Sequence, residues 1–569
     1  MNSMLKTLIR RTYVLKVNGG GHRVSVAAGK MLQTFEDCVF QQIDKKFISS
    51  MDYDKKISSI DAKYYQINDK ISNNNMNENN NESDMQNYNE EYEEAVKALN
   101  ALQSNAESLR SSIHKHKRLN SLQDTQRYLL KSGLSGKDLE KLSYIHVSGT
   151  KGKGSTCALA DAILRSYGVK TGFYSSPHLV SVTERIRLNG QPISKQKFTQ
   201  YFWPVYNKLM ETQEYENDMP AYFKFLTILS FHVYLAEKVD VVIMEVGIGG
   251  ELDCTNVLPN TKTVGISSLG LEHTQLLGET LKEIAWQKAG IIKPYATVYT
   301  SVTQPECLEV IQQRANEKQA KVYRVPDFVS YFQDPKVEYI KQQLNNCTVL
   351  NGSLALQLAY DWLRQNCNGF HREYEINQAC LTEQAIKGIL NCNWPGRCQK
   401  VKFFNFNIHL DGAHTVESMQ VCGNWFAQVT TASSLPKILI FNTTGDRDSL
   451  KLLTILRNFS SFDLVCFVPN ISSLSNNKNH DNQSVLYSHV EQLKRAQMHA
   501  SNWQEMCKKA NETNTGKVFP SIVQCFQHIL QVYNKSQELN VLVTGSIHLI
   551  GATILSLNEL CPVLNEQHA

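Results

Sequence analysis

The stretch from Tyr144 to Ser155, YIHVSGTKGKGS, places an apolar run, a glycine-rich turn and a helix start in the order that a phosphate-binding site requires. Three glycines lie in the turn: Gly149, Gly152 and Gly154. Glycine permits a positive φ angle and a close backbone approach, so successive amide N–H groups can point at phosphate oxygens. Lys153 supplies a positive charge, and we expect Ser155 or Thr156 to open the following helix, whose positive dipole end faces the same anion.

This turn departs from the G-x-x-x-x-G-K-[ST] pattern of many nucleotide-binding loops. Val147 stands five residues before Gly152, and Gly154 separates Lys153 from the hydroxyl residue that follows. The predicted strand and helix on either side of the turn favour a nucleotide-phosphate site. A structural strand-to-helix turn is the alternative.

The chain is long enough for two or more domains, with 569 residues of which 42% are hydrophobic. Its net charge of +5 is nearly balanced and no basic block with interleaved aromatics is present, so the composition does not favour nucleic-acid binding. The 14 cysteines show no repeated C-x-x-C spacing, which favours reduced thiols over a disulfide framework or a zinc site. Without a run of about 18 apolar residues, stable membrane insertion is not expected.

Residues 1–40 resemble a mitochondrial transit peptide, because the first 35 residues contain basic side chains between Leu, Ile, Val and Ser but no acidic one. We therefore expect a presequence and a mitochondrial matrix form, with Met31 as a possible internal start for a cytoplasmic form. A disordered basic tail is the alternative. Residues 41–91 turn to Asn, Asp, Lys, Ser and Glu, which predicts a low-complexity flexible insertion.

From Tyr92 onward, apolar strands alternate with helical patterns, which predicts an α/β fold with a mainly parallel sheet. The Pro-Gly break in NWPGR, at Asn393–Arg397, marks the predicted boundary between two domains. We expect a central ATP-binding domain over residues 92–395 and a smaller C-terminal α/β, Rossmann-like domain over residues 396–569.

Polar side chains follow several of the predicted strands, where ligand sites of α/β sheets form. Ser176 ends one strand, and its hydroxyl is a possible Mg²⁺ ligand or part of a Ser-Pro turn. Glu245 ends a continuous apolar strand, so its buried charge requires a metal ion or a base as partner. His273 follows the next strand, and Lys288 lies among apolar residues that should lower its pKa.

Several sequence blocks together resemble the folylpolyglutamate synthase family of the Mur-ligase superfamily. They are YEEAVKALNALQSNA, VSGTKGKGSTCA, GFYSSPHLVSVTERIRLNGQPIS, MEVGIGGELDCTN, HTQLLGETLKEIAWQKAGI, WPGRCQ, DGAHTVESM and VTGSIHLIG. Their order is similar to that of the eukaryotic members, which serve cytosol and mitochondria. One block departs from the family, because the H-x-x-x-N pattern is here Cys347 to Asn351 and lacks its histidine.

The resemblance implies functions for individual positions. Residues that would hold ATP phosphates are Gly152, Lys153, Gly154 and Ser155. Mg²⁺ ligands would be Ser176, Glu245 and His273. Lys288 matches a lysine that several relatives carry as a carbamate, which could help to hold a second Mg²⁺. Arg397 and Asp411 match ATP contacts from the C-terminal domain, and Asn256 lies in a motif associated with nucleotide binding.

The implied reaction is an ATP-dependent ligation of L-glutamate to the γ-carboxylate of a reduced folate through an acyl phosphate. His414 is a candidate for the base that deprotonates the glutamate amine, with a hydrogen-bonded structural histidine as the alternative. The substrates would be small molecules, and we expect a monomer. A dihydrofolate synthase or bifunctional enzyme, and a nucleotide-binding module without ligase chemistry, are the competing hypotheses.

Overall fold

The computed structural model describes residues 82–103, 121–259, 261–332, 340–341, 344–368, 370, 375–445, 447–473, 481, 488–513, 516–533 and 537–566. All of them belong to one compact unit that spans residues 62–569. The predicted transit peptide and residues 41–81 of the predicted insertion lie outside the described residues. No helix among the described residues is long and apolar enough to cross a membrane.

Within the described residues, the larger of two sheets contains eight strands in the order β4-β3-β2-β5-β1-β6-β7-β8. Its strands are β1 (Tyr144–Ser148), β2 (Thr171–Tyr174), β3 (Ile186–Leu188), β4 (Gln191–Pro192), β5 (Val241–Glu245), β6 (Thr263–Ile266), β7 (Thr297–Thr300) and β8 (Lys321–Arg324). The six strands from β2 to β8 in this order pair in parallel, and β3 and β4 add an antiparallel edge. The predicted mainly parallel sheet is therefore confirmed.

Strand β5 shows why this sheet needs helices on both faces. All five of its residues are buried. Val242 and Met244 belong to the hydrophobic cluster on one face, whereas Val241 and Ile243 belong to the cluster on the other face. Such uninterrupted apolar strands are typical of parallel sheets that are covered on both sides.

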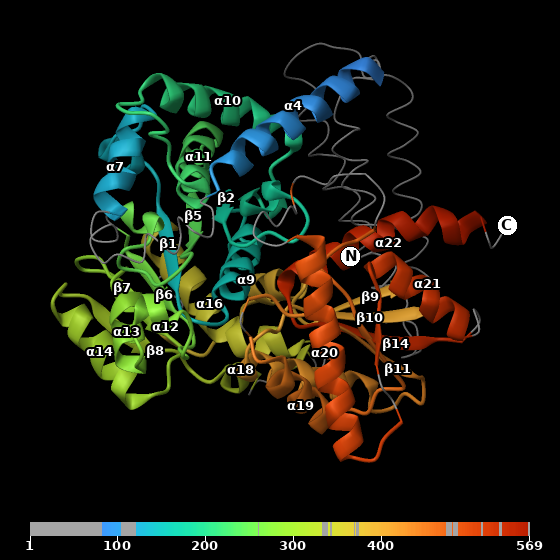
Figure 1. The fold of residues 1–569 in the computed structure, drawn as a ribbon. Helices are drawn as coiled ribbons and strands as arrows, with labels where there is room; N and C mark the ends of the chain where they lie inside the picture. Colours follow the sequence, from blue (N-terminus) through green and yellow to red (C-terminus); the bar gives the residue numbers. More distant parts are fainter. Residues whose placement is uncertain are drawn as a thin grey trace, which may run out of the picture. The chain divides into compact units, whose positions relative to one another are not determined.

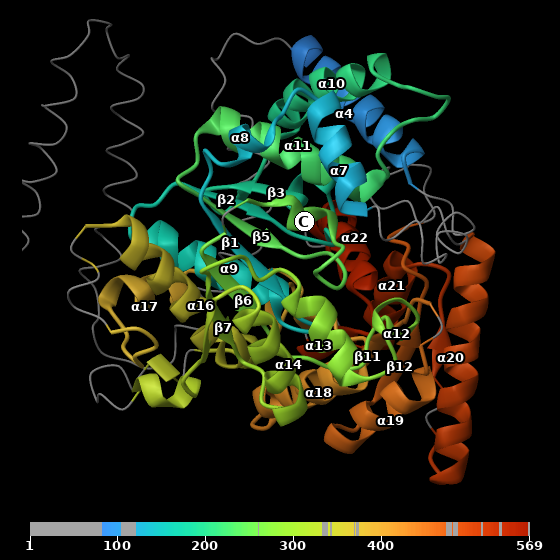
Figure 2. The same ribbon diagram turned by 90° about the vertical axis from the view of Figure 1, so that its left-hand side faces the viewer.

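Helices from both ends of this region cover the two faces. The helices are α4 (Glu82–Ala101), α7 (Ser121–Lys131), α8 (Gly136–Leu139), α9 (Lys153–Ser166), α10 (Lys195–Glu211), α11 (Tyr222–Glu237), α12 (Thr274–Leu277), α13 (Leu281–Ala289), α14 (Pro305–Asn316), α16 (Asn346–Asn366) and α17 (Glu383–Leu390). Figure 2 shows α4, α7, α10 and α11 together, and their apolar residues share one cluster with β1, β2 and β5. The apolar residues of α9, α16 and α17 form the cluster on the opposite face.

The smaller sheet contains six strands in the order β13-β12-β11-β14-β10-β9, of which only β9 is antiparallel to its neighbour. Its strands are β9 (Gln399–Phe403), β10 (Phe406–Asp411), β11 (Lys437–Phe441), β12 (Leu464–Phe467), β13 (Lys517–Val518) and β14 (Leu539–Thr544). Figure 1 shows the helices of this part near the sheet, namely α18 (Val416–Thr430), α19 (Ser449–Phe459), α20 (His489–Lys509), α21 (Ile522–Val532) and α22 (Ile547–Glu566). This arrangement confirms the predicted second α/β sheet.

The two sheets are linked by a segment that follows β2. Leu179 and its neighbour Val180 pack into the hydrophobic cluster of the smaller sheet, although they come from the part of the chain that forms the larger one. A Cβ atom on Gly551 would lie 1.9 Å from the Leu179 carbonyl oxygen, so α22 approaches this segment closely. Close backbone packing therefore joins the part of the chain that forms the larger sheet to the part that forms the smaller sheet. We call these parts the two halves, and they meet at the segment that also carries Ser176.

The structure adds local detail and corrects one expectation. Glu184 and Arg185 lie in a 3-10 helix, η1 (Val182–Arg185), which the Glu184 carboxylate caps, and Arg187 follows in β3. Strand β8 is followed by a 3-10 helix, η3 (Phe328–Phe332). Helix α4 already begins at Glu82, inside the predicted insertion.

Candidate active site

The phosphate loop follows β1, which lies between β5 and β6 in the sheet. Because the three strands are parallel, the loop, the end of β5 at Glu245 and the segment after β6 that carries His273 leave the same edge of the sheet. Three segments far apart in the sequence therefore meet at one edge.

The glycines of the loop serve different purposes. Gly149 and Gly152 have positive φ angles of 142° and 89°, as predicted. Gly154 does not, because it lies inside α9, and its lack of a side chain serves close packing instead. A Cβ atom there would lie 3.2 Å from the Trp394 ring and 3.3 Å from the Glu245 carboxylate. The helix begins at Lys153 with Gly152 as its N-cap, so the prediction that Ser155 or Thr156 opens it was wrong.

Two lysines converge on one carbonyl of the loop. Lys153 Nζ donates to the Gly149 oxygen at 2.9 Å, and Lys288 Nζ donates to the same oxygen at 2.7 Å. Lys288 is 4% exposed. Burial lowers the pKa of Lys288 to about 7, and the positive charge of Lys153 adds to this effect. The predicted lowering of this pKa is thus reproduced, and the amine is partly neutral near neutral pH.

Glu245 lies at the end of β5 and is buried. Its Oε2 atom accepts a hydrogen bond from the Ser176 backbone N–H at 3.1 Å. Burial raises the pKa of Glu245, while the nearby charges of Lys153 and Arg397 oppose the shift. The buried carboxylate therefore has basic neighbours, as its charge requires, and lies against the segment that carries the Ser176 hydroxyl.

His273 is the most exposed of the three predicted metal ligands. It is the N-cap of α12 and has a left-handed backbone, with φ of 53°. Partial burial of the ring lowers the pKa of His273, and the charges of Lys153 and Lys288 lower it further. Among the described residues, no hydrogen bond joins His273 to Ser176 or Glu245. The structure thus brings the serine and the glutamate into contact and places His273 near the same lysines.

Asn256 is buried at the loop after β5. Its Nδ2 atom donates to the carbonyl oxygens of Glu251 at 2.9 Å and Gly290 at 3.1 Å. These two contacts tie the loop to the end of α13. The amide group of Asn256 therefore supports the local backbone.

Arg397 and Asp411 come from the part of the chain that forms the smaller sheet. Asp411 ends β10 and accepts hydrogen bonds from the backbone N–H groups of Cys398 at 2.8 Å and Ala413 at 3.0 Å. A Cβ atom on Gly412 would lie 2.7 Å from Arg397 Nη1, so the guanidinium lies directly over that glycine. The charge of Arg397 acts on both Asp411 and Glu245, which brings the predicted ATP contacts to the same region as the predicted metal ligands.

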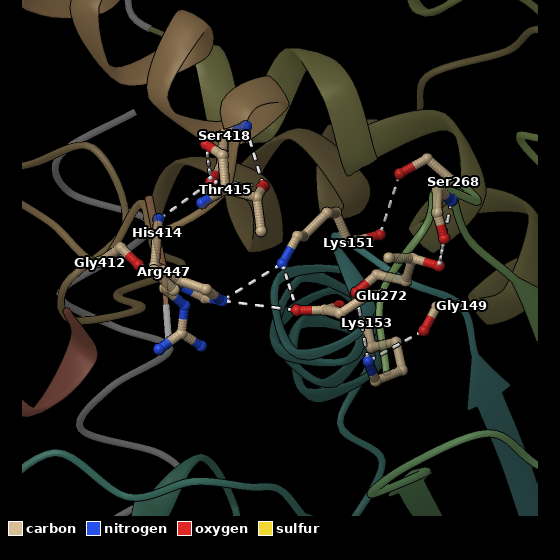
Figure 3. A network of polar contacts seen from close by, with 12 residues as sticks. Gly149, Lys151, Lys153, Ser268, Glu272, Gly412, His414, Thr415, Ser418 and Arg447 are labelled. Atoms are coloured by element: carbon tan, nitrogen blue, oxygen red, sulfur yellow. Dashed lines mark hydrogen bonds and ion pairs between the residues drawn. The ribbon is translucent and has the colours of Figure 1, made fainter. Parts of the chain in front are cut away.

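A polar network joins the two halves at His414 (Figure 3). Lys151 Nζ donates to Glu272 Oε1 at 2.8 Å and to His414 Nε2 at 3.2 Å. His414 Nδ1 lies 2.7 Å from the Gly412 carbonyl oxygen, so the proton resides on Nδ1 and Nε2 is left as the acceptor. Burial lowers the pKa of His414, although Glu272 opposes the shift. This histidine is therefore both hydrogen-bonded and able to accept a proton.

The residues present fit a polyanion and a hard divalent cation. The charged side chains around the loop include Lys151, Lys153, Lys288 and Arg397, together with the carboxylates of Glu245, Glu272 and Asp411. A bound triphosphate would pair with the cationic groups among them. A serine hydroxyl, a carboxylate and an imidazole are ligands that suit Mg²⁺ or Mn²⁺.

Sequence reasoning missed several residues of this region. Lys151 and Glu272 were not singled out, although each stands next to a predicted residue in its loop. Asn351 was named only as the end of the block that departs from the family, and in the structure it abuts the phosphate loop, because a Cβ atom on Gly152 would lie 2.0 Å from its Oδ1 atom. Cys347, Cys398 and Asp411 form a cluster whose ligand atoms lie within 4.8 Å of one another. No spacing signal could reveal this cluster, since its members come from three separate segments.

Comparisons with known proteins point to one family. No family model matches the chain. Mitochondrial folylpolyglutamate synthase from Cricetulus griseus is 37% identical over 545 residues, which cover 82% of this chain and 91% of the relative. The Homo sapiens protein of the same name is 37% identical over 552 residues, covering 84% and 93%.

A solved structure shares the fold. It is a bifunctional folylpolyglutamate synthase/dihydrofolate synthase from Yersinia pestis, complexed with AMPPNP and a Mn ion. The TM-score is 0.56 at 22% sequence identity, and the match covers 77% of this chain and 93% of that one.

Proposed function

The chain belongs to the folylpolyglutamate synthase family, and from this premise we propose that it joins L-glutamate to the γ-carboxylate of a folate while ATP is cleaved to ADP and phosphate. The observation that carries the proposal is the 37% identity to a named folylpolyglutamate synthase over 82% of the chain. We assign roles in this ATP-dependent ligation to the residues of the candidate site.

We assign the ATP phosphates to the loop before α9. The backbone N–H groups of Gly152, Gly154 and Ser155 lie at the positive end of this helix, where anions bind. In the structure Lys153 folds back onto the Gly149 carbonyl, so its ammonium group is held within the loop. Arg397 and Asp411 would contact the nucleotide from the other half of the chain, and Asn256 would support the neighbouring loop.

The chemical problem in this reaction is that a carboxylate is a poor electrophile at neutral pH. Attack of the folate γ-carboxylate on the terminal phosphorus of ATP converts it to an acyl phosphate and releases ADP. Lys153 would offset the charge that develops on the phosphate oxygens. The amine of glutamate then attacks the activated carbonyl carbon, and phosphate leaves with the former carboxylate oxygen.

Ser176, Glu245 and His273 would hold a divalent cation, and the relative from Yersinia pestis, whose structure contains a Mn ion, supports the presence of a metal. A bound Mg²⁺ would neutralise charge on the phosphate oxygens and orient the reactants. The buried Glu245 supports this assignment best, because an ionised carboxylate in that position needs a cationic partner.

Lys288 would carry a carbamate group when nucleotide and metal are bound, and this group would help to hold a second Mg²⁺. Carbamylation requires a neutral amine to attack carbon dioxide, and a pKa of about 7 supplies that form near neutral pH. Depletion of carbon dioxide should then lower turnover, and bicarbonate should restore it in the wild type. An identical response of Lys288→Arg would contradict the assignment, because the guanidinium of arginine stays protonated.

The incoming glutamate must attack as a neutral amine, and we assign the proton to His414 Nε2. The neighbours of that nitrogen are the polar side chains of Lys151 and Glu272. Because His414 and Lys153 come from different halves of the chain, catalysis would require the halves to close over ATP.

We infer localisation and assembly from weaker observations. Relatives are named as mitochondrial proteins, and the acid-free start of the chain supports a presequence for the matrix, alongside a cytoplasmic form. We also propose a monomer, which the molar mass of the protein in solution would test.

One incubation separates the candidate functions. Purified protein is supplied with ATP, Mg²⁺ and radiolabelled glutamate, with tetrahydrofolate in one series and dihydropteroate in the other. We expect incorporation with tetrahydrofolate and none in Lys153→Ala. Incorporation with dihydropteroate alone would instead support dihydrofolate synthase, whose activity occurs together with folylpolyglutamate synthase in the bifunctional relative. Nucleotide binding without incorporation in either series would indicate a non-catalytic module.

A further inference from the structure

Two thiols from separate segments meet beside the candidate active site. Cys347 lies in the first turn of α16, and Cys398 immediately precedes β9. Their Sγ atoms are 3.3 Å apart, although 51 positions separate them in the sequence. Both are free thiols in the structure. A disulfide bond needs the two sulfurs to approach to about 2 Å, so only a small displacement separates the pair from a bond.

Each thiol is connected to one side of the nucleotide site. The Cys347 carbonyl oxygen accepts a hydrogen bond from Asn351 Nδ2 at 2.7 Å, and Asn351 abuts Gly152 of the phosphate loop. The Cys398 N–H group donates to Asp411 Oδ2 at 2.8 Å. The pair therefore lies where the half that carries the phosphate loop meets the half that carries Asp411.

We propose that Cys347 and Cys398 form a reversible disulfide that ties α16 to the segment before β9 and so holds the two halves of the active site together. The pair is suited to this chemistry because Cys347 is half-buried and can be reached by a small oxidant, whereas Cys398 is 4% exposed and can act as the second, protected thiol. Disulfides of this reversible kind are the type found in reducing compartments.

A structural metal is the competing use of this cluster, since the Asp411 carboxylate lies near both sulfurs. Both carboxylate oxygens already accept backbone N–H groups, from Cys398 and Ala413. Two thiolates and one such carboxylate also fall one protein ligand short of a closed structural zinc site. The cluster therefore favours bond formation between the thiols.

The oxidant would be a small disulfide such as glutathione disulfide. The Cys347 thiolate attacks one sulfur of the oxidant, a mixed disulfide forms at Cys347, and the first glutathione leaves. The Cys398 sulfur then attacks Cys347 Sγ and expels the second glutathione. The two protons lost by the cysteines end on the two glutathione thiols, so two protein thiols are oxidised and one disulfide is reduced. Asp411 is hydrogen-bonded to the Cys398 thiol, so it can take that proton first and pass it on to the departing glutathione.

The bond would fix the contact between the halves and slow the opening that nucleotide exchange requires. This effect on turnover rests on the proposed function, whereas bond formation does not. The two can be measured separately, because the crosslink is visible by mass spectrometry of digested protein even in the absence of any activity.

The test treats the full chain with glutathione disulfide after reduction, and compares the wild type with Cys347→Ser, Cys398→Ser and Cys367→Ser. Cys367 is the matched control, since it is also half-buried but follows the opposite end of α16. We expect a peptide crosslinked between Cys347 and Cys398 in the wild type and in Cys367→Ser. The loss of turnover should parallel the crosslinked fraction and be reversed by dithiothreitol, and neither Cys347→Ser nor Cys398→Ser should show this reversible loss.

Two results would overturn the proposal. The first is the absence of a crosslinked peptide between the two thiols after treatment with the oxidant, whether both thiols can still be alkylated or a bound metal protects them. The second is a crosslink that leaves turnover unchanged, which would remove the effect on the active site. A reduced wild type that incorporates no glutamate would count against the proposed function instead, and the crosslinking result would be unaffected.

Discussion

Lys153 and Lys288 direct their ammonium groups at the same acceptor, the carbonyl oxygen of Gly149. Holding both groups in their charged form costs free energy, because the two charges repel each other and because Lys288 is buried away from water. The pKa of Lys288 therefore falls to about 7, with burial as the largest cause and Lys153 as the next. Without a bound anion, the two ammonium groups at the phosphate loop therefore repel each other.

The first prediction concerns stability. Between pH 7 and its ordinary pKa of 10.5, Lys288 is protonated in the unfolded chain but not in the folded one, so the free energy of unfolding should rise with pH in this window. Lys288→Met removes this dependence. The variant should melt higher than the wild type at pH 7, and the difference should shrink at about pH 9.5, as thermal unfolding can show. A difference in melting temperature that does not vary with pH would contradict this explanation.

The second prediction concerns the buried carboxylate at the end of β5. Glu245→Gln keeps the shape of the side chain but removes the charge that we assign to metal binding. Turnover should fall by roughly 100-fold or more, because several kcal/mol of transition-state stabilisation is lost. The melting temperature of the nucleotide-free variant at pH 7 should be equal or higher, since an ionised carboxylate no longer has to be buried. Near-normal turnover at saturating Mg²⁺ would show that Glu245 holds no essential metal.

A third prediction tests why Gly154 is a glycine. The added methyl group of Gly154→Ala would lie 3.2 Å from Trp394 and 3.3 Å from the Glu245 carboxylate, so we expect a higher KM for ATP with a modest loss of stability. Gly136→Ala is the control, because a Cβ atom there meets nothing within 4 Å and Gly136 lies in a helix. Steady-state kinetics of both variants provide the comparison, and equal KM values would rule out the packing explanation.

A fourth prediction concerns His414. If its Nε2 atom accepts the proton of the glutamate amine, His414→Ala should lower kcat by about 100-fold or more while the KM for ATP changes little. Because burial lowers the pKa of His414, the neutral form persists below pH 6.5, and the acid limb of the wild-type kcat profile should lie below that value. Glu272→Gln, which removes the carboxylate beside it, should shift that limb further toward acid. A higher KM for glutamate or ATP with an unchanged kcat would instead indicate a binding role.

The sequence predicted the elements that rest on local patterns. The strand, turn and helix around Gly149 and Lys153 follow from apolar periodicity and glycine chemistry, and the structure has all three. The buried carboxylate Glu245 was recognisable because a charge at the end of an uninterrupted apolar strand is costly unless it is compensated. Parallel strands that end at a common edge then bring such residues together.

Other features depend on contacts between distant segments, which no local pattern encodes. Gly154 was expected to permit a positive φ angle. In the structure it instead permits the close approach of Trp394, which lies 240 positions later in the printed sequence. The partnership of Lys151 with Glu272 and His414 likewise depends on how the two halves meet. The contact between Cys347 and Cys398 also depends on how the two halves meet, and no spacing in the sequence predicts it.

The most direct test of the central claim follows an oxygen atom. The account holds that this chain activates the γ-carboxylate of a folate as an acyl phosphate before glutamate attacks. When the substrate carries ¹⁸O in that carboxylate, the released phosphate should contain one ¹⁸O atom, in amounts that match the glutamate incorporated. Glutamate incorporation accompanied by phosphate without the label would contradict the account.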